Sequence, residues 1–413
     1  MASESERARV AIVGAGIAGL VIATILRRRG VHCELFEQSP VFDAVGAGIQ
    51  LSPNGVRILH RLGVAPALAE NGVQARSIET RRWDDGRLLA RVPHGTACDE
   101  LFGAPYYLIH RADLQRCLVN MLTPGTVHLG RSVARVVERA DHVELHFADG
   151  GTATAELVIG ADGVHSAVRR AVVLDEPKFS GYSVYRGLIP AEVVPSFAAD
   201  PRVMFWFGPK HHVTYYPISA GKTVHFSAVC ATDDERLGSS TTGTETDELA
   251  AAFAGWNAEV RRVVTAAASV TRWGLFDRDL ADRYVSGRLA LVGDAAHPML
   301  PYMSQGANQA LEDAVVLTDC LGDGSRDPVR SLRHYEALRK PRTAEVHRQS
   351  RIRAESFHFA DGVRQQERDF RLAGETLNDL AWLYGYDAAL TPAQLEALNG
   401  RAALGEHRHE VVS

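Results

Sequence analysis

Three short apolar runs along the chain are each followed closely by glycine, and two of them also by aspartate. They are residues 10–13, followed by Gly-Ala-Gly, residues 157–160, followed by Ala-Asp-Gly, and residues 289–292, followed by Gly-Asp-Ala. Uninterrupted runs of this length predict buried strands of a parallel sheet, whose carboxyl ends meet at one edge where ligands bind. Because the runs are far apart in sequence, this domain must be assembled from separated segments.

A different pattern fills residues 178–230, where aromatic, β-branched and polar side chains alternate. Period-two alternation, with turn residues such as Gly208-Pro209 and Ala220-Gly221 between the runs, predicts an antiparallel sheet. We expect residues 74–92 to add strands to this sheet. From Leu311 onward the pattern is helical, and we expect the tail beyond about residue 400 to be loosely held.

The first apolar run opens a glycine turn with the spacing of a dinucleotide-binding site. In such a turn Gly14 permits the tight bend, Gly16 lets a pyrophosphate approach the backbone, and Gly19 lets the next helix pack on the strand. Glu37 closes the following strand, 23 positions after Gly14 (37 − 14), where an acid accepts hydrogen bonds from ribose hydroxyls. An unliganded glycine turn is the alternative, but the agreement of these features predicts an adenine dinucleotide.

Composition narrows the class of protein further. The 413 residues correspond to two or three domains, and 46% of them are hydrophobic. A formal charge of −5 indicates neither nucleic-acid nor acidic-membrane partners. The five cysteines lack metal-ligand or redox spacing, so we expect reduced thiols, no metal site and a cytoplasmic location. Residues 10–26 are apolar, but their turn glycines argue against a membrane span.

Two further motifs accompany the glycine turn. Residues 160–169 read Gly-Ala-Asp-Gly-Val-His-Ser-Ala-Val-Arg, and residues 293–298 read Gly-Asp-Ala-Ala-His-Pro, leading into residues 305–314. The set resembles the single-component FAD-dependent aromatic hydroxylases. Within them it is most similar to the branch of salicylate, 3-hydroxybenzoate and 6-hydroxynicotinate hydroxylases. The resemblance extends over about residues 8–390.

The resemblance implies an α/β fold with three parts. A Rossmann-like FAD-binding domain would be assembled from residues 1–75, 105–175 and 278–330, a substrate domain with the antiparallel sheet from residues 76–104 and 176–277, and C-terminal helices and tail from residues 331–413. It also implies tightly but non-covalently bound FAD, a small aromatic substrate, O2, and NAD(P)H as a transient co-substrate. The assembly would be a monomer or homodimer.

Several side chains and backbone groups are expected to hold FAD. Asp294, just past a strand end, would accept hydrogen bonds from ribityl hydroxyls. The backbone N–H groups of Gly306, Ala307 and Asn308 begin a helix and would stabilise negative charge at the N1/O2 edge of the flavin. The resemblance implies further contacts: Asp162 near FAD and NAD(P)H, and Gly48 in the loop 46–50 beside the isoalloxazine. It also implies that Arg111 lies at the phosphates. The alternative for Arg111 is a salt bridge at the start of a helix.

The reaction implied is oxygen transfer from a flavin C4a-hydroperoxide to an electron-rich ring. A phenol substrate needs a base that removes its proton. In residues 208–217, His212 matches the base of the 3-hydroxybenzoate branch, whereas the 6-hydroxynicotinate branch matches His211 and Tyr215. Strand alternation allows only one of these sets to face the flavin. We favour His212 with Tyr216, because imidazole titrates near neutrality. A surface histidine pair is the alternative.

The expected substrate contacts are Gln50, Tyr215, Pro301 and Tyr302. Pro301 stands where the 3-hydroxybenzoate branch has glutamine, and Tyr302 where the 6-hydroxynicotinate branch has histidine. Since neither pattern is complete, we expect another substrate of hydroxybenzoate, aminohydroxybenzoate or heteroaromatic type. A flavin epoxidase or oxidoreductase of the same fold in a biosynthetic pathway, or a flavin-dependent redox sensor, is the alternative function.

Overall fold

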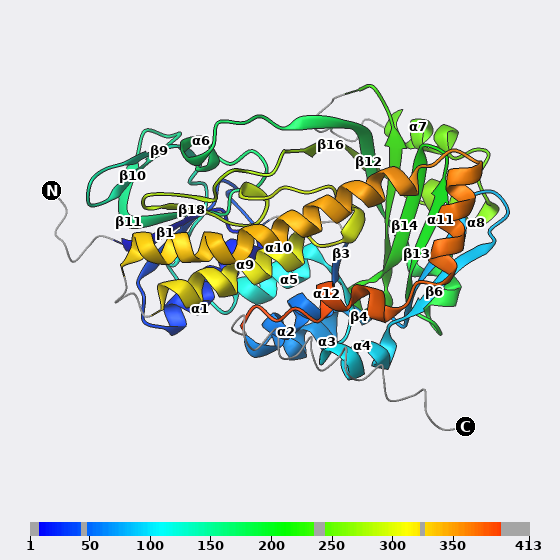
Figure 1. Cartoon of the computed structure of the whole chain (residues 1–413), viewed down its shortest axis with the longest axis horizontal. Helices are drawn as coiled ribbons and strands as arrows, with labels where there is room; N and C mark the ends of the chain where they lie inside the picture. The colour runs from blue at the N-terminus through cyan, green and yellow to red at the C-terminus, as the bar shows by residue number, and fades with distance from the viewer. Residues whose placement is uncertain (1–7, 43–47, 235–243, 323–326, 390–413) are drawn as a thin grey trace.

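The computed structural model describes residues 8–42, 48–234, 244–322 and 327–389, and all statements below refer to this part of the chain. Figure 1 shows two large sheets at opposite ends of an elongated molecule, joined along one side by long helices. The mixed α/β architecture expected from the sequence is confirmed.

The first sheet has eight strands, and its main path follows the order β17-β18-β11-β1-β2-β8. Strand β1 pairs in parallel with both β2 and β11, and β11 pairs in parallel with β18. The three apolar runs are therefore neighbouring parallel strands, as predicted. The strands are β1 (Ala8–Val13), β2 (Cys33–Phe36), β8 (Val127–His128), β9 (Val133–Glu138), β10 (Val143–Phe147), β11 (Thr152–Gly160), β17 (Val285–Ser286) and β18 (Leu289–Leu291).

The second sheet has seven strands in the order β16-β12-β15-β14-β13-β5-β6. Its pairs are antiparallel except for β13 with β5. One face packs on helices α7 (Thr244–Ala252) and α8 (Ala258–Thr265) through a fully apolar cluster. The strands are β5 (Ser77–Arg82), β6 (Leu88–Pro93), β12 (Lys178–Pro190), β13 (Arg202–Gly208), β14 (His211–Ile218), β15 (Thr223–Ala231) and β16 (Val270–Asp277).

A three-stranded sheet lies between the two large ones and has the order β3-β7-β4. Its strands are β3 (Gly48–Leu51), β7 (Tyr107–His110) and β4 (Val73–Gln74). The loop predicted over residues 46–50 is therefore a strand from Gly48 onward, and residues 46 and 47 lie outside the described residues. The shorter helices are α1 (Ile17–Arg28), α2 (Pro53–Arg61), α3 (Ala65–Asn71), α4 (Gly95–Phe102), α5 (Arg111–Val119) and α6 (Arg169–Val172).

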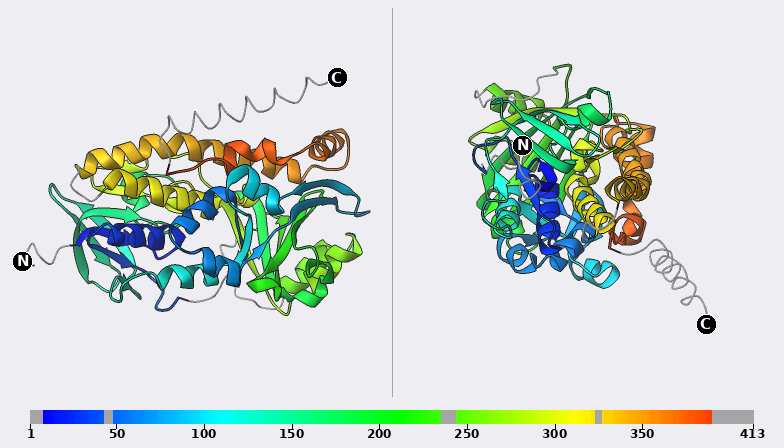
Figure 2. Two further views of the ribbon diagram at one scale, coloured as in Figure 1. Left: turned by 90° about the horizontal axis from the view of Figure 1, so that it is seen from below. Right: turned by 90° about the vertical axis from the view of Figure 1, so that its left-hand side faces the viewer.

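The C-terminal helices connect the two ends of the molecule. Helix α9 (Gly306–Leu321) packs on α1, and α10 (Pro328–Phe357) packs on α9. The 30 residues of α10 span about 45 Å, which takes this helix from the first sheet to the second (Figure 2). The chain then forms α11 (Val363–Ala373) and α12 (Ala381–Tyr384). The expected loose tail lies outside the described residues.

A buried ion-pair cluster ties α9 to α10. Arg339 of α10 donates to Glu312 and Asp313 of α9, each at 2.6 Å, and all three side chains are fully buried. The second oxygen of Asp313 accepts hydrogen bonds from the backbone N–H of Gly293 at 2.7 Å and from His297 at 2.6 Å. The cluster therefore holds the Gly-Asp-Ala-Ala-His-Pro motif against the start of the helical region.

Candidate functional site

The glycine turn after β1 uses each of its three glycines differently. Gly14 has φ +101°, and a Cβ there would lie 2.4 Å from the carbonyl oxygen of Ala161. A Cβ on Gly19 would lie 2.0 Å from the carbonyl oxygen of Gly14. Gly16 has open space where a Cβ would be, and it begins α1 without a side-chain cap. The turn is thus tightly packed on the protein side and open at the helix N-terminus, where an anion binds.

The side chain of Glu37 stabilises this turn by accepting hydrogen bonds from two backbone N–H groups. One of its carboxylate oxygens accepts from the N–H of Ala15 at 2.8 Å and the other from the N–H of Ser39 at 2.9 Å. Gln115 of α5 holds Ala15 from the other side by donating to its carbonyl oxygen at 2.9 Å. Each carboxylate oxygen has a further lone pair, so the ribose contact of Glu37 stays a prediction.

The second motif, residues 160–169, bonds within its own loop and to the third motif. The carboxylate of Asp162 accepts from Ser166 Oγ and from the N–H of Ala167 at 2.7 Å, so it is turned into its own loop. Arg169, fully buried, donates to the carbonyl oxygens of Ala295 and Ala296 at 2.7 and 2.8 Å. Asp162 therefore shapes the loop that Arg169 ties to the third motif, and its expected place near FAD and NAD(P)H stays a prediction.

The third motif leads to an open helix start. Asp294 is exposed, and its Oδ1 lies 3.9 Å from where a Cβ on Gly306 would be. Helix α9 begins at Gly306 without a side-chain cap, so the N–H groups of residues 306–308 have no partner within the helix. The Asn308 side chain is engaged elsewhere, because it donates to the carbonyl oxygen of Gln50 and accepts from the N–H of Ser52, both at 3.1 Å.

These features fit FAD. Arg111 at the start of α5 is exposed and forms no ion pair with a described residue, which argues against the salt-bridge alternative. When FAD is bound, Gly16 and Arg111 would hold its phosphates, Asp294 its ribityl hydroxyls, and the α9 N–H groups the polar edge of the flavin. Gly48 serves packing, since a Cβ there would lie 2.8 Å from the ring of Tyr216.

Strand β14 separates the candidate catalytic side chains onto two faces. His212 and Tyr216 face the side away from α7 and α8. Tyr215 lies on the opposite face, where its hydroxyl donates to Glu259 at 2.5 Å and accepts from Trp206 at 3.0 Å. This position disfavours the expected substrate contact of Tyr215, and with it the set of His211 with Tyr215.

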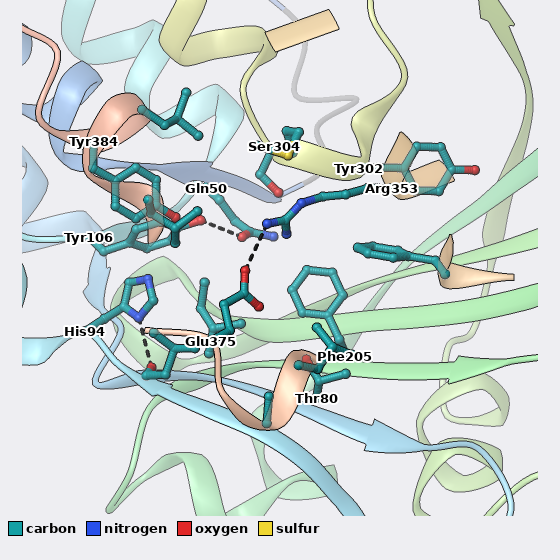
Figure 3. Close-up of a pocket in the computed structure, with 18 of the residues that line it drawn as sticks. Gln50, Thr80, His94, Tyr106, Phe205, Tyr302, Ser304, Arg353, Glu375 and Tyr384 are labelled. Atoms are coloured by element: carbon teal, nitrogen blue, oxygen red, sulfur yellow. Dashed lines mark hydrogen bonds and ion pairs between the residues drawn. The ribbon is translucent and has the colours of Figure 1, made fainter. Parts of the chain in front are cut away.

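A cavity lies on the His212 face, between the second sheet and the C-terminal helices. Gln50, Phe205 and Tyr302 line it, as does Tyr106, which donates from its hydroxyl to Gln50 at 2.8 Å. Figure 3 shows the ring of Tyr302 at the cavity edge with its hydroxyl directed away from Gln50. Pro301 is exposed and is not among the lining residues; it begins the 3-10 turn η6 (Pro301–Met303) that positions Tyr302.

His212 does not line this cavity, but its ring packs near that of Tyr302, which does. Its Nδ1 is 2.8 Å from Nε2 of His358, and its ring centroid is 5.4 Å from that of Tyr302. Burial and the neighbouring imidazoles hold the pKa of His212 well below its usual range, and burial lowers that of His358 to about 3. Both rings are therefore neutral at pH 7 and share one N–H···N hydrogen bond.

Tyr216 forms the other polar end of this face. Gln50 donates to its hydroxyl oxygen, and burial raises the pKa of Tyr216, so the phenol stays protonated. Gln50 thus links Tyr106, which lines the cavity, to Tyr216, which does not.

Sequence reasoning missed the residues that close the cavity from the C-terminal side. Arg353, Glu375 and Tyr384 line it, together with His94 from the segment after β6 (Figure 3). None belongs to a recognised motif. The helical spacing of Arg353 and Phe357 is the only local signal, because residues four apart share a helix face.

The comparisons with known proteins agree with this site. Residues 7–350 match the family described as FAD binding domain. The 3-amino-4-hydroxybenzoate 2-monooxygenase of Streptomyces cremeus is 60% identical over 386 residues, covering 93% of this chain and 97% of that protein. The 6-hydroxynicotinate 3-monooxygenase of Pseudomonas fluorescens is 33% identical, covering 94% and 97%. Klebsiella pneumoniae HpxO, solved with FAD and uric acid, superposes with a TM-score of 0.82 at 29% identity, covering 93% and 97%.

Fold, site and relatives together define a flavin-dependent monooxygenase that hydroxylates small aromatic rings, with FAD as cofactor and NAD(P)H as co-substrate. The chain belongs to the FAD binding domain family. Among the described helices, none is both long and apolar enough to cross a membrane.

Proposed function

We propose that the protein hydroxylates 3-amino-4-hydroxybenzoate, or a close aminohydroxybenzoate, at C2. The observation that carries the proposal is the 60% identity to an enzyme of that name over almost its whole length. The incomplete patterns at Pro301 and Tyr302 support it, because they set this chain apart from the 3-hydroxybenzoate and 6-hydroxynicotinate branches.

The overall reaction replaces the C2–H bond of the ring by C2–OH. One atom of O2 enters the product, the other leaves as water, and NAD(P)H supplies the two electrons. Bound FAD supplies the activated oxygen. The protein must hold the ring with C2 against the flavin and exclude bulk water. C2 is ortho to the amino group, whose lone pair makes this carbon electron-rich, and meta to the hydroxyl.

The two polar ends of the β14 face suit a ring with para substituents. His212 and Tyr216 are four residues apart, and their Cα atoms are therefore about 13 Å apart. In 3-amino-4-hydroxybenzoate the hydroxyl and the carboxylate are para to each other. We assign the hydroxyl to the end of the cavity nearest His212, whose neutral imidazole is held by His358 through Nδ1 and can accept a hydrogen bond from the hydroxyl. The opposite end of the ring then lies toward Gln50, which lines the cavity and bonds Tyr106.

The test is turnover of defined substrates by the FAD-loaded enzyme. With 3-amino-4-hydroxybenzoate under 18O2, we expect NAD(P)H oxidation to be stimulated and one 18O to appear at C2, located by mass spectrometry and NMR. 6-Hydroxynicotinate, 3-hydroxybenzoate and 4-amino-3-hydroxybenzoate serve as controls. Preferential hydroxylation of a control, or failure to hydroxylate any of the four, would overturn the proposal.

A further inference from the structure

The C-terminal part of the chain brings a cation into the substrate cavity. Arg353 lies near the end of α10 and reaches toward Gln50 and Glu375 (Figure 3). Its Nη2 donates to Oε1 of Glu375 at 3.0 Å, and the two side chains are 32% and 21% exposed. Glu375 stands between α11 and the 3-10 turn η7 (Leu377–Leu380), so the ion pair joins two segments of the cavity wall.

Most of the hydrogen-bonding capacity of Arg353 is unused. A guanidinium has five N–H donors in a planar fork, and the bond to Glu375 is its single hydrogen bond to the described residues. Because Arg353 lines the cavity, the remaining donors are accessible to a ligand. A planar donor fork matches a carboxylate, which it can bind through two parallel hydrogen bonds.

The described lining of the cavity has no second permanent cation. His94 also lines it, but burial lowers the pKa of His94 to about 4, so its ring is neutral at pH 7. The competing cation is Arg186 of β12, which lies near Tyr216 and Arg111 rather than among the lining residues. A carboxylate entering this cavity therefore meets Arg353 as its counter-charge.

Helix α10 supplies a partner for both ends of the ring. Arg353 and Phe357, four residues apart, both line the cavity, and the next residue, His358, bonds His212. On the proposed function, the phenol hydroxyl lies at the His212 end and the carboxylate at the other. Arg353 reaches toward Gln50, which bonds both Tyr106 and Tyr216 at that other end.

We propose that Arg353 binds the carboxylate of the aromatic substrate and so determines selectivity for aromatic acids, a role that rests on the proposed function. Glu375 orients the guanidinium and, as a nearby negative charge, weakens its hold on the acid. The specificity of the enzyme is thereby set by the C-terminal helices rather than by the sheet that carries His212.

The experiment compares an acid with its uncharged isostere. Dissociation constants of 3-amino-4-hydroxybenzoate and 3-amino-4-hydroxybenzamide are measured by calorimetry on the FAD-loaded enzyme. In Arg353→Gln we expect binding of the acid to weaken about 10- to 100-fold and binding of the amide to change less than about threefold. In Glu375→Gln we expect the acid to bind as tightly as in wild type or more tightly.

Arg348→Gln is the matched control. Arg348 is on the same helix, is exposed, and pairs with Glu345 of its own helix at 2.7 Å, so neither ligand should be affected. A purely structural Arg353–Glu375 bridge predicts another result: Arg353→Gln and Glu375→Gln would weaken the acid and the amide alike. That outcome overturns the proposal, as does an acid preference that survives Arg353→Gln but is lost in Arg186→Gln.

The two proposals fail separately. If wild type hydroxylates 3-amino-4-hydroxybenzoate but Arg353→Gln keeps the wild-type ratio of acid to amide affinity, only the role of Arg353 is overturned. If wild type does not hydroxylate this compound, the proposed substrate is wrong. The comparison is then made with 3-hydroxybenzoate and 3-hydroxybenzamide, where an unchanged ratio again overturns the role of Arg353.

Discussion

At the scale of single residues, the site depends on which face of a strand or loop each side chain occupies. His212 and His211 are adjacent and chemically identical, yet only His212 bonds His358 beside the cavity wall, whereas the ring of His211 lies 5.7 Å from that of Phe253 on the opposite face. Alternation along β14 predicts that the two histidines differ. It does not predict which one faces the flavin, because that depends on the helices packed behind the sheet.

The role of His212 as base can be tested by its removal. In His212→Gln we expect kcat to fall by at least about 100-fold, with the lost rate partly recovered at high pH as the phenol ionises on its own near pH 10. FAD binding should be unchanged. The measurement is the pH dependence of product formation.

His211→Gln is the control for this substitution. It should retain kcat within about twofold, since its ring lies on the far face of the sheet. Equal losses in the two variants, or a His212→Gln enzyme with the wild-type pH profile, would show that His212 has only a structural role.

At the scale of elements, two glycines of the β1–α1 turn have different roles: Gly16 leaves space for the cofactor, and Gly19 is required for the fold. Gly16→Ala places a methyl group in open space, so we expect normal stability and FAD affinity reduced by at least about tenfold, because the pyrophosphate needs that space. Gly19→Ala meets the carbonyl oxygen of Gly14 and should destabilise the fold itself. Thermal unfolding of the apoprotein and FAD titration separate the two effects. A Gly16→Ala protein that binds FAD like wild type would contradict the assignment.

The α9–α10 pair depends on its buried ion cluster. In Arg339→Gln, Asp313 loses its guanidinium partner and Glu312 keeps only Arg342, at 3.1 Å, so we expect the free energy of unfolding to fall by about 3–5 kcal/mol. Arg348→Gln removes an exposed pair on the same helix and should cost less than about 1 kcal/mol. Urea unfolding of both variants measures the difference. Equal losses would mean that the cluster contributes no more than a surface pair.

At the scale of the whole molecule, buried neutral histidines make stability depend on pH. Burial lowers the pKa of His94 to about 4, and those of His225 and His358 to about 3. In the unfolded chain histidine titrates near 6.5, so below that pH the unfolded state takes up protons that the folded state does not. Stability is complete above about pH 6.5 and is lost as the pH falls toward 4, by about 2 kcal/mol for each histidine between pH 7 and pH 5.

Urea unfolding of the FAD-loaded enzyme at these two pH values measures the effect. We expect His94→Gln to lessen the loss on acidification by about 2 kcal/mol. His334→Gln, which removes an exposed histidine of α10, should leave it unchanged. An acid loss that is identical in both variants would exclude His94 as a contributor.

The sequence by itself determined the features that are local in the chain. The strand of residues 10–13, the glycine turn and the start of α9 each depend on neighbouring residues, so hydrophobic pattern and glycine spacing were sufficient to predict a dinucleotide site and a resemblance to flavin hydroxylases. Tertiary structure decided the rest. Arg353 and Glu375 line the cavity more than 100 residues after Gln50, and His358 bonds His212 from 146 residues away. Such contacts leave no periodic signal. The carboxylates of Asp162 and Glu37 also accept from nearby backbone N–H groups, a role that the sequence does not predict, because a buried donor without a partner is costly.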